Sequence, residues 1–258
     1  MITIIIPAYN EKNRIKYAAE TTIRVLINIT TDYEIIIVED GSNDGTYEIS
    51  SKLEEKTPNI RLLHSDIRCG KGFALKKGIK AAKGDVIGFI DADLSTDMSY
   101  MPELIDAIRV EGYDISIGSR LKYTSKTERS KKRSIASTIY NLSVRWILGS
   151  RFYDHQCGFK AFKRSSIYEI IDQIKDEQWF WDTEMLIKAQ RNGYKIKEIP
   201  VRWSDADATS LNFFKDGLVM GLKILRLRWD LTKNKKIASP EIDVMPMKNT
   251  ERWGKNER

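Results

Sequence analysis

The sequence predicts an α/β protein with a mostly parallel central sheet and helices on both faces of that sheet. Two observations support this fold class. Short runs of apolar and β-branched residues alternate with longer stretches in which apolar residues recur at helical spacing. The chain also has 258 residues and is 41% hydrophobic, which is enough to bury the core of a substantial domain.

The N-terminal part of the chain alternates strands with helices. Strands are expected at residues 3–6, 34–38, 60–64 and 85–90. Helices are expected at residues 10–29, 44–56 and 72–82. Pro7 begins a turn before the first helix, and Gly84 closes the third, as turn and helix-stop residues usually do. This alternation predicts parallel strands joined by crossover helices.

The pattern changes after a further strand at 114–117. Residues 119–133 form a polar, basic segment, and a helix is expected at 135–148. Its apolar residues at helical spacing are Ile135, Ile139, Leu142 and Trp146. A second wide apolar stripe consists of Leu211, Phe214, Leu218, Leu222, Leu225 and Trp229. We therefore expect one domain at 1–208, a basic amphipathic helical appendage at 209–232, and a polar tail at 233–258.

The charge of the chain indicates an anionic partner. The formal net charge is +7, from 43 Lys and Arg against 36 Asp and Glu. A phosphate-bearing substrate, a nucleic acid or an acidic lipid surface would suit this excess. Aromatic residues are not interleaved with the basic segment in a stacking pattern, so we expect no nucleic-acid partner.

Cysteine and histidine usage narrows the kinds of site. Cys69 and Cys157 are the only cysteines and neither belongs to a Cys-x-x-Cys motif, which argues against a zinc site or a disulfide framework. No stretch approaches the about 20 apolar residues that span a bilayer, and the N-terminus lacks the features of a signal peptide. We expect a cytoplasmic protein that is soluble or rests on a membrane surface.

Two carboxylates follow the fourth expected strand. Asp91 and Asp93 point the same way if they continue that strand, because side-chain direction repeats every two residues. Such a pair can hold Mg²⁺ or Mn²⁺, which prefer oxygen ligands and accept bridging phosphates. The alternative is a solvated Asp-x-Asp loop without a ligand. Polar clusters also follow the first and second strands, at 7–11 and 39–42, and in parallel sheets such strand ends meet at one ligand-binding edge.

The motifs of the chain, in order, resemble family 2 inverting glycosyltransferases over about residues 1–205. The closest similarity is to dolichyl-phosphate β-glucosyltransferases and dolichol-phosphate mannose synthases. The residues that carry it lie at 6–11, 38–46, 70–72, 91–95, 118–120, 156–162 and 179–184. The resemblance implies a single nucleotide-sugar-binding domain with the glycosyltransferase A-type fold.

The resemblance also assigns roles in the donor site. It implies that Asp40 bonds the nucleobase and that Lys71 lies near the ribose or phosphates. The nucleotide pocket would further include Pro7, Tyr9, Glu11 and Ala92. Asp91 would contact the sugar or ribose, and Asp93, with Asp91 beside it, would ligate Mg²⁺ or Mn²⁺ bridging the two phosphates. The chemistry agrees, since hard cations suit diphosphate oxygens.

Asp182 falls where the family places its catalytic carboxylate. With a sugar acceptor this group would be a general base that removes a hydroxyl proton. A lipid monophosphate has a second pKa of about 6 and is already largely ionised at neutral pH, so it needs orienting more than deprotonating. Asp182 could then position the sugar or counter a cation, and Glu184 is a rival for the role.

Three arginines are candidates for binding the acceptor phosphate. Arg120 and Arg133 match basic positions of the dolichol-phosphate mannose synthases, and the planar fork of arginine grips phosphate through two hydrogen bonds. Relatives often have a Ser-Lys pair after the region of Arg202, where this chain has Thr209-Ser210. Arg202 is a candidate to replace that lysine. The alternative is that these residues belong to a solvated basic surface.

Taken together, the sequence predicts an inverting, metal-dependent enzyme that transfers a hexose to dolichyl or polyprenyl phosphate. UDP-glucose is the expected donor and GDP-mannose the alternative; transfer to a sugar or protein acceptor is a second alternative. The helical appendage would lie on the inner face of the membrane, although an amphipathic helix can equally pack on its own domain.

Overall fold

The computed structural model of the chain describes residues 1–128, 131–204 and 213–233. The side chains at 128, 131–133 and 213–216 lie outside this description. The main sheet contains β1 (Ile2–Ala8), β2 (Tyr33–Asp40), β3 (Ile60–Ser65), β4 (Val86–Ile90), β5 (Ile115–Ser119), β7 (Phe159–Lys163) and β8 (Ile196–Pro200). The short strands β6 (Lys126–Glu128) and β9 (Arg202–Ser204) pair separately.

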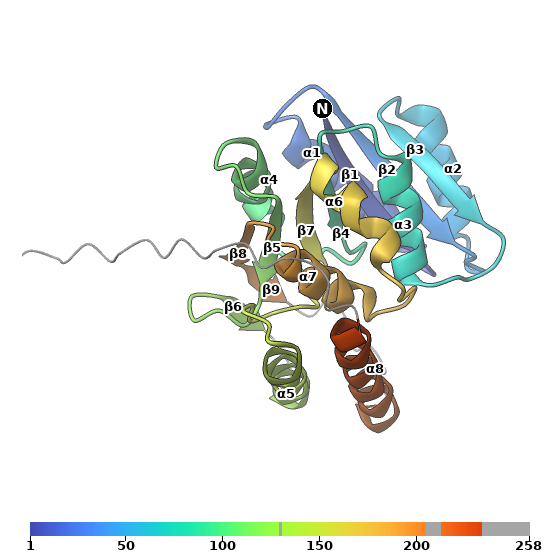
Figure 1. Cartoon of the computed structure of the whole chain (residues 1–258). Coiled ribbons are helices and arrows are strands. Elements are labelled where there is room, and N and C mark those ends of the chain that lie inside the picture. Colours follow the sequence, from blue (N-terminus) through green and yellow to red (C-terminus); the bar gives the residue numbers. More distant parts are fainter. Residues whose placement is uncertain (129–130, 205–212, 234–258) are drawn as a thin grey trace, which may run out of the picture.

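Helices surround the sheet (Figure 1). They are α1 (Ile15–Leu26), α2 (Thr46–Lys56), α3 (Lys71–Ala81), α4 (Met101–Arg109), α5 (Lys131–Leu148), α6 (Arg164–Ile170), α7 (Trp181–Arg191) and α8 (Phe213–Lys233). Two 3₁₀ turns, η1 (Met98–Tyr100) and η2 (Ile171–Gln173), precede α4 and follow α6.

The sheet is mostly parallel, as the sequence predicts. Its strand order is β3-β2-β1-β4-β7-β5-β8, and only β7 runs antiparallel to its neighbours. The order reverses at β1, which lies between β2 and β4. At such a switch point the connections leave in opposite directions and open a crevice at the carboxyl ends of the strands. The polar segments after β1, β2 and β4 all end at this crevice.

Two hydrophobic cores cover the two faces of the sheet. Alternate residues of β1 divide between them: Ile4 and Ile6 pack with α1 and α4, whereas Ile5 packs with α3 and α7. Because side chains of a strand alternate between faces, a run of isoleucines buried on both sides is typical of a central parallel strand. The cores fix the strand ends that carry the polar segments.

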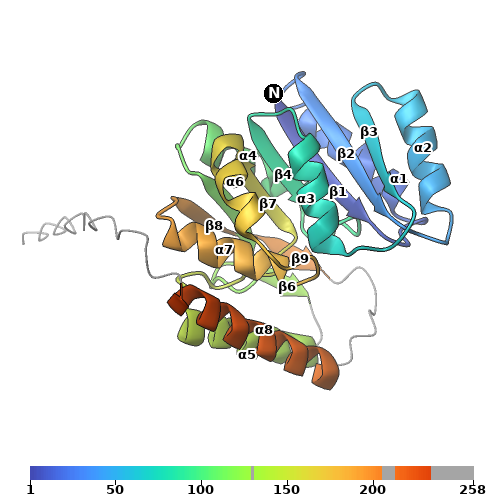
Figure 2. The ribbon, with the colours of Figure 1, turned by 45° about the vertical axis from the view of Figure 1, so that its right-hand side comes forward.

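The helices α5 and α8 lie side by side in a layer beyond the main sheet (Figure 2). They share a third core in which Val144, Leu148, Ile224 and Leu227 pack with Phe180 and Ile187. The predicted helix at 135–148 and the predicted C-terminal helix are therefore both present. None of the helices in the described ranges has the length and apolar composition needed to cross a bilayer.

Some expected bounds are corrected. The first helix begins at Ile15 rather than residue 10, because Asn10 adopts φ 56° and a left-handed residue cannot continue a right-handed helix. The basic segment contains β6 and the start of α5. The tail expected at 233–258 starts one residue later, because Lys233 still belongs to α8. The expected domain boundary at 208–209, Leu211 and residues 234–258 lie outside the described residues.

Candidate active site

The loops that follow β1 and β2 are tied together by hydrogen bonds. The Asn10 backbone amide donates to the Ser42 hydroxyl at 3.0 Å, and the Asn43 amide donates to Asn10 Oδ1 at 3.1 Å. The Glu11 amide donates to Thr46 Oγ1 at 2.8 Å. These contacts hold the two polar segments as one wall of the crevice.

Asp40 anchors the chain that leads into α3. Its carboxylate accepts from the backbone amides of Cys69, at 2.9 Å, and Gly70, at 2.7 Å. Gly70 has φ +117°, a backbone conformation that residues with a Cβ rarely adopt, so glycine is favoured there. This anchor places Lys71, the first residue of α3, at the crevice.

Partly buried acidic side chains gather near the end of β4. Partial burial raises the pKa of Glu11; Arg14, 3.0 Å away, opposes this, and the charges of Asp93 and Asp91 reinforce it. Glu11 therefore feels both carboxylates of the Asp-x-Asp pair. The Arg68 guanidinium lies 3.9 Å from the ring centroid of Tyr9, which brings a cation to the same wall.

A row of alternating charges crosses the bottom of the crevice. Lys71 Nζ lies 2.6 Å from Asp91 Oδ1 and 3.9 Å from Asp182 Oδ2. Asp182 Oδ1 in turn accepts a 2.7 Å hydrogen bond from Lys160 Nζ. Burial opposes the charge of Lys71, but Asp91 and Asp182 outweigh it and raise the pKa of the ammonium. We call Asp91, Lys71, Asp182 and Lys160 the charge row.

Lys160 is a fixed, fully buried member of the charge row. Besides Asp182, its ammonium donates to the backbone carbonyls of His155, at 3.1 Å, and Cys157, at 2.6 Å. An ammonium has three hydrogens, so these three acceptors satisfy it completely. Within the part of the chain that the structure describes, the Lys71 ammonium by contrast donates one hydrogen bond, to Asp91.

The backbone around Asp91 and Asp93 is tightly constrained. The Asp91 amide donates to the Gly158 carbonyl at 3.1 Å, and Asp93 Oδ1 accepts from the Ser95 amide at 3.0 Å. Leu94, directly after Asp93, adopts φ 49°, which is rare for a residue with a bulky side chain. Strained residues of this kind concentrate at functional sites, where the surroundings enforce them.

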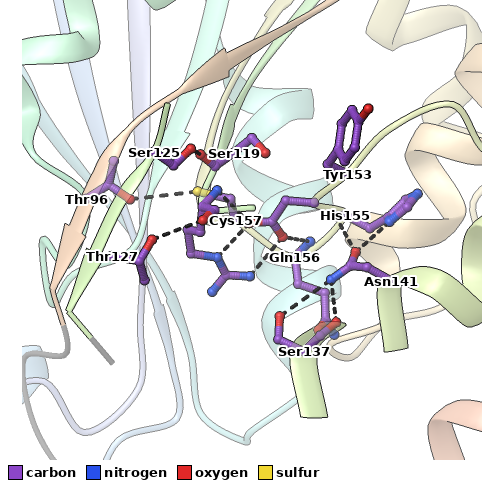
Figure 3. Close-up of polar contacts among 12 residues, drawn as sticks. Thr96, Ser119, Ser125, Thr127, Ser137, Asn141, Tyr153, His155, Gln156 and Cys157 are labelled. Carbon is purple, nitrogen blue, oxygen red and sulfur yellow. Dashed lines mark hydrogen bonds and ion pairs between the residues drawn. The ribbon is translucent and has the colours of Figure 1, made fainter. Parts of the chain in front are cut away.

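A second buried ion pair supports the segment behind Asp91. Arg120 grips Asp154 through Nε, at 2.7 Å, and Nη2, at 2.9 Å. Burial alone would raise the pKa of Asp154, but the Arg120 guanidinium holds it far below its usual range. Beyond this pair, Asn141 of α5 accepts from the His155 backbone and ring (Figure 3). Burial lowers the pKa of His155 to about 4, so it is neutral.

Comparison with known proteins decides the family. The family model described as glycosyl transferase family 2 matches residues 3–171. This chain belongs to glycosyltransferase family 2. The chain is 40% identical over 239 residues to glycosyltransferase AglD of Haloferax volcanii, and the alignment covers 92% of this chain but only 38% of that protein.

Two further comparisons agree. The dolichyl-phosphate beta-glucosyltransferase of Dictyostelium discoideum is 32% identical over 241 residues, which are 88% of this chain and 74% of that protein. The glucosyl-3-phosphoglycerate synthase of Mycobacterium tuberculosis, solved with Mn²⁺, UDP-glucose and phosphoglyceric acid, superposes with a TM-score of 0.63 at 17% identity. That superposition covers 89% of this chain and 79% of the other. The predicted family and the glycosyltransferase A-type fold are confirmed.

Most of the sequence-predicted donor residues lie along the one crevice. Ion pairs join Lys71 to Asp91 and Asp182, and Glu11 feels the charges of Asp91 and Asp93. Pro7, Tyr9 and Asp40 lie at the ends of β1 and β2, whereas Ala92 is buried in the core. Glu184, the rival of Asp182, instead accepts from the backbone amides of Lys175 and Asp176. The roles of these residues stay predictions, but their placement favours Asp182 over Glu184.

The arginines expected to bind the acceptor phosphate lie in different surroundings. Two nitrogens of the Arg120 fork are already used by Asp154, and Arg202 is exposed and lies 3.2 Å from Asp97. The side chain of Arg133 lies outside the described residues. Sequence reasoning missed Lys160. The available signal was a lysine inside an otherwise apolar strand, which needs a buried acidic partner.

The Asp-x-Asp pair fits a divalent cation that is shared with a substrate. Among the described residues, no group of three or more His, Cys, Asp or Glu side chains could hold a metal by itself. Asp93 and Asp91 offer hard oxygen ligands, and Mg²⁺ in phosphate-transfer sites takes its other ligands from phosphate and water. The donor set therefore suits a cation completed by a diphosphate.

Gly158→Ala tests whether the position of Asp91 matters. A Cβ at residue 158 would lie 1.8 Å from Asp91 Oδ2, so the carboxylate must move. We expect metal-dependent nucleotide binding, measured by calorimetry with UDP and Mn²⁺, to weaken at least tenfold while thermal stability changes little. Gly217→Ala is the matched control, because nothing lies within 4 Å of its Cβ. Unchanged binding in Gly158→Ala would refute the role of Asp91.

Proposed function

We propose that this glycosyltransferase moves a hexose from a nucleotide diphosphate sugar to a polyprenyl or dolichyl phosphate, with inversion at the anomeric carbon. The observation that carries the proposal is the charge row beside Asp93, at the switch point of the sheet. The name of the Dictyostelium relative supports a lipid-phosphate acceptor and a glucosyl donor. UDP-glucose is accordingly the proposed donor.

Each donor residue then has a chemical task. Asp40 and the wall around Tyr9 hold the nucleoside, and Asp93 and Asp91 are the residues that would hold Mg²⁺ or Mn²⁺. When bound, the cation neutralises the charge that develops on the departing nucleoside diphosphate. Lys71 lies beside Asp91 and adds a positive charge from the protein side.

The reaction needs a single displacement. An oxygen of the acceptor phosphate forms the new bond to the anomeric carbon, and the bond from that carbon to the diphosphate oxygen breaks with its electron pair. No covalent enzyme intermediate is involved, and the product is a β-linked lipid-phosphate sugar. Such in-line transfer depends mainly on holding nucleophile and leaving group in register.

Asp182 is proposed to act as a fixed charge and not as a base. Its carboxylate is buried, accepts from Lys160 at 2.7 Å and faces Lys71 at 3.9 Å. The lipid phosphate is already largely ionised at neutral pH, because its second pKa is about 6. Asp182 therefore has two cations to balance and no proton to remove; it sets the position of Lys71.

The acceptor phosphate is proposed to enter on the side of Arg120 and Arg202. Arg120 lies directly after β5, and its guanidinium is 5.6 Å from the ring centroid of Trp203. Trp203 and Asp93 line the same small cleft. Arg133 is retained as a third candidate from the resemblance.

The enzyme is proposed to work on a membrane surface through the outer faces of α5 and α8. On α8, Met220, Ile224, Leu227 and Leu231 pack inward. The exposed set on the same helix is Leu218, Leu222, Leu225 and Trp229. Both sets follow a four-three-four spacing, and at 3.6 residues per turn they occupy opposite sides of the helix. One apolar stripe of α8 is thus buried against the domain, whereas the second is exposed.

Helix α5 repeats this arrangement. Its inner side packs through Val144 and Leu148, whereas its exposed apolar residues are Ile135, Ile139, Leu142 and Trp146. The helices α5 and α8 lie side by side (Figure 2). We propose that their two outer stripes together form one apolar platform. Arg226 and Arg228 flank its α8 stripe.

The composition of this platform suits an anionic bilayer. Trp146 is 89% and Trp229 is 62% exposed, and tryptophan favours the membrane–water interface. Amphipathic helices with basic flanks bury their apolar stripe at the headgroup level. A lipid acceptor whose chain stays in the bilayer also requires the enzyme to come to that surface.

A transfer assay tests the reaction. The protein is incubated with Mg²⁺ or Mn²⁺, a polyprenyl phosphate, and labelled UDP-glucose or GDP-mannose. We expect label in the lipid fraction from UDP-glucose and none when the metal is chelated. Label from GDP-mannose alone would identify the mannosyl alternative, and the absence of lipid label from every donor would refute the proposal.

Asp182→Asn separates a fixed charge from a general base. Loss of a base costs up to about 10⁴-fold in rate; we expect a loss below about 100-fold with a polyprenyl phosphate acceptor. The acid limb of the rate profile, near pH 6, should persist because it reports ionisation of the acceptor phosphate. Binding of UDP with Mn²⁺ verifies that the variant is folded. Complete loss of transfer by a folded variant would instead favour the base.

Cosedimentation with vesicles tests the platform. We expect binding to vesicles of phosphatidylglycerol and phosphatidylcholine, weaker binding to phosphatidylcholine alone, and an at least tenfold loss in the double variant Trp146→Ser/Trp229→Ser. Tyr17→Ser is the matched control, since Tyr17 is 61% exposed on α1, away from α5 and α8. Equal binding by all three proteins would exclude the platform.

A further inference from the structure

Trp179 is an exposed indole at the edge of the charge row. It is 60% exposed, although residues 180–187, directly after it, are all buried. Lys71 Nζ lies 5.4 Å from the centroid of its ring and 2.6 Å from Asp91 Oδ1. The indole, Asp91 and Asp182 are therefore gathered around one ammonium group.

The chain on both sides of Trp179 is held in place. Gln178 Nε2 donates to the Cys69 carbonyl at 2.8 Å, and the Phe73 amide donates to the Glu177 carbonyl at 3.1 Å. A Cβ at Gly72 would lie 2.8 Å from Trp181 Cβ, so the start of α3 packs directly on this segment. Trp179 is thus presented by a braced backbone and does not sit on a loose loop.

The chemistry of this position favours a sugar ring as ligand. The CH-rich face of a pyranose is apolar, and a flat indole face can cover it, whereas the hydroxyl groups remain available to Asp91, Lys71 and Asp182. Sites for small ligands commonly combine an aromatic surface with a few convergent polar groups. An aromatic side chain on a backbone that is already held in place gives a large contact area at little cost in conformational entropy.

We propose that Trp179 is a donor-binding residue that stacks on the hexose of the nucleotide sugar. This inference rests on the proposed function, since it assumes a nucleotide-sugar donor at the charge row. It places the hexose between the indole and the Asp91 carboxylate, with the nucleoside toward Asp40. Trp179 then selects for the sugar part of the donor and not for the nucleotide.

Comparing UDP with UDP-glucose isolates the contact. Affinities of wild type, Trp179→Ala and Trp179→Phe are measured by calorimetry with Mg²⁺. We expect Trp179→Ala to weaken UDP-glucose at least tenfold, which is about 1.4 kcal/mol, and to change UDP by less than about twofold. Trp179→Phe should fall between, because it keeps a smaller aromatic face.

Tyr17→Ala removes an aromatic ring of the same exposure far from the site and should leave both affinities unchanged. An equal loss for UDP and UDP-glucose would mean that Trp179 contacts the nucleotide, and an effect confined to the KM of the lipid acceptor would assign it to the acceptor. Either result, or unchanged donor affinity, overturns the inference while the proposed function stands. A wild-type protein that binds no nucleotide sugar overturns both.

Discussion

The buried ion pair between Lys160 and Asp182 is the interaction on which the rest of the site depends. Lys160 belongs to β7 and Asp182 to the first turn of α7, so the pair fixes that helix against the sheet. Desolvating two charges is costly, and removal of one partner of such a pair typically destabilises a protein by about 3–5 kcal/mol. The same pair holds Asp182 within reach of Lys71, and through Lys71 it reaches Asp91.

Two glycines allow the elements that carry the charge row to pack closely. Gly158 lets the Asp91 carboxylate lie against the backbone of the segment before β7, and Gly72 lets α3 pack on the start of α7. Both contacts lie between elements that carry members of the charge row. A methyl group at Gly158 would displace the Asp91 carboxylate, and one at Gly72 would push α3 away from the backbone before α7, so the spacing of the charges depends on both glycines.

Local patterns predicted the first half of the fold, whereas the roles of the donor residues come from the family resemblance and stay predictions. β1, β2, β3 and β4 follow from β-branched runs, and Asp40, Asp91 and Asp93 follow from strand ends. The ion pair between Lys160 and Asp182 could not be predicted from local patterns, because it depends on β7 lying antiparallel between β4 and β5 in the sheet. The apolar pattern of α8 also does not identify the stripe that faces the domain. Residues 220, 224, 227 and 231 form a second apolar stripe at the same helical spacing as the predicted one.

The two helices of the platform also brace the site from their inner sides. Tyr140 of α5 shares a 2.6 Å hydrogen bond with Thr183, next to Asp182, and Lys223 of α8 lies 2.5 Å from Asp176. Asp176 and Glu177 are the residues on which α3 packs at Gly72. The platform proposed to bind the membrane is thus linked through Tyr140 and Lys223 to the segment that carries Asp182. This arrangement would let a lipid phosphate meet the donor at the surface while its hydrocarbon chain stays in the membrane.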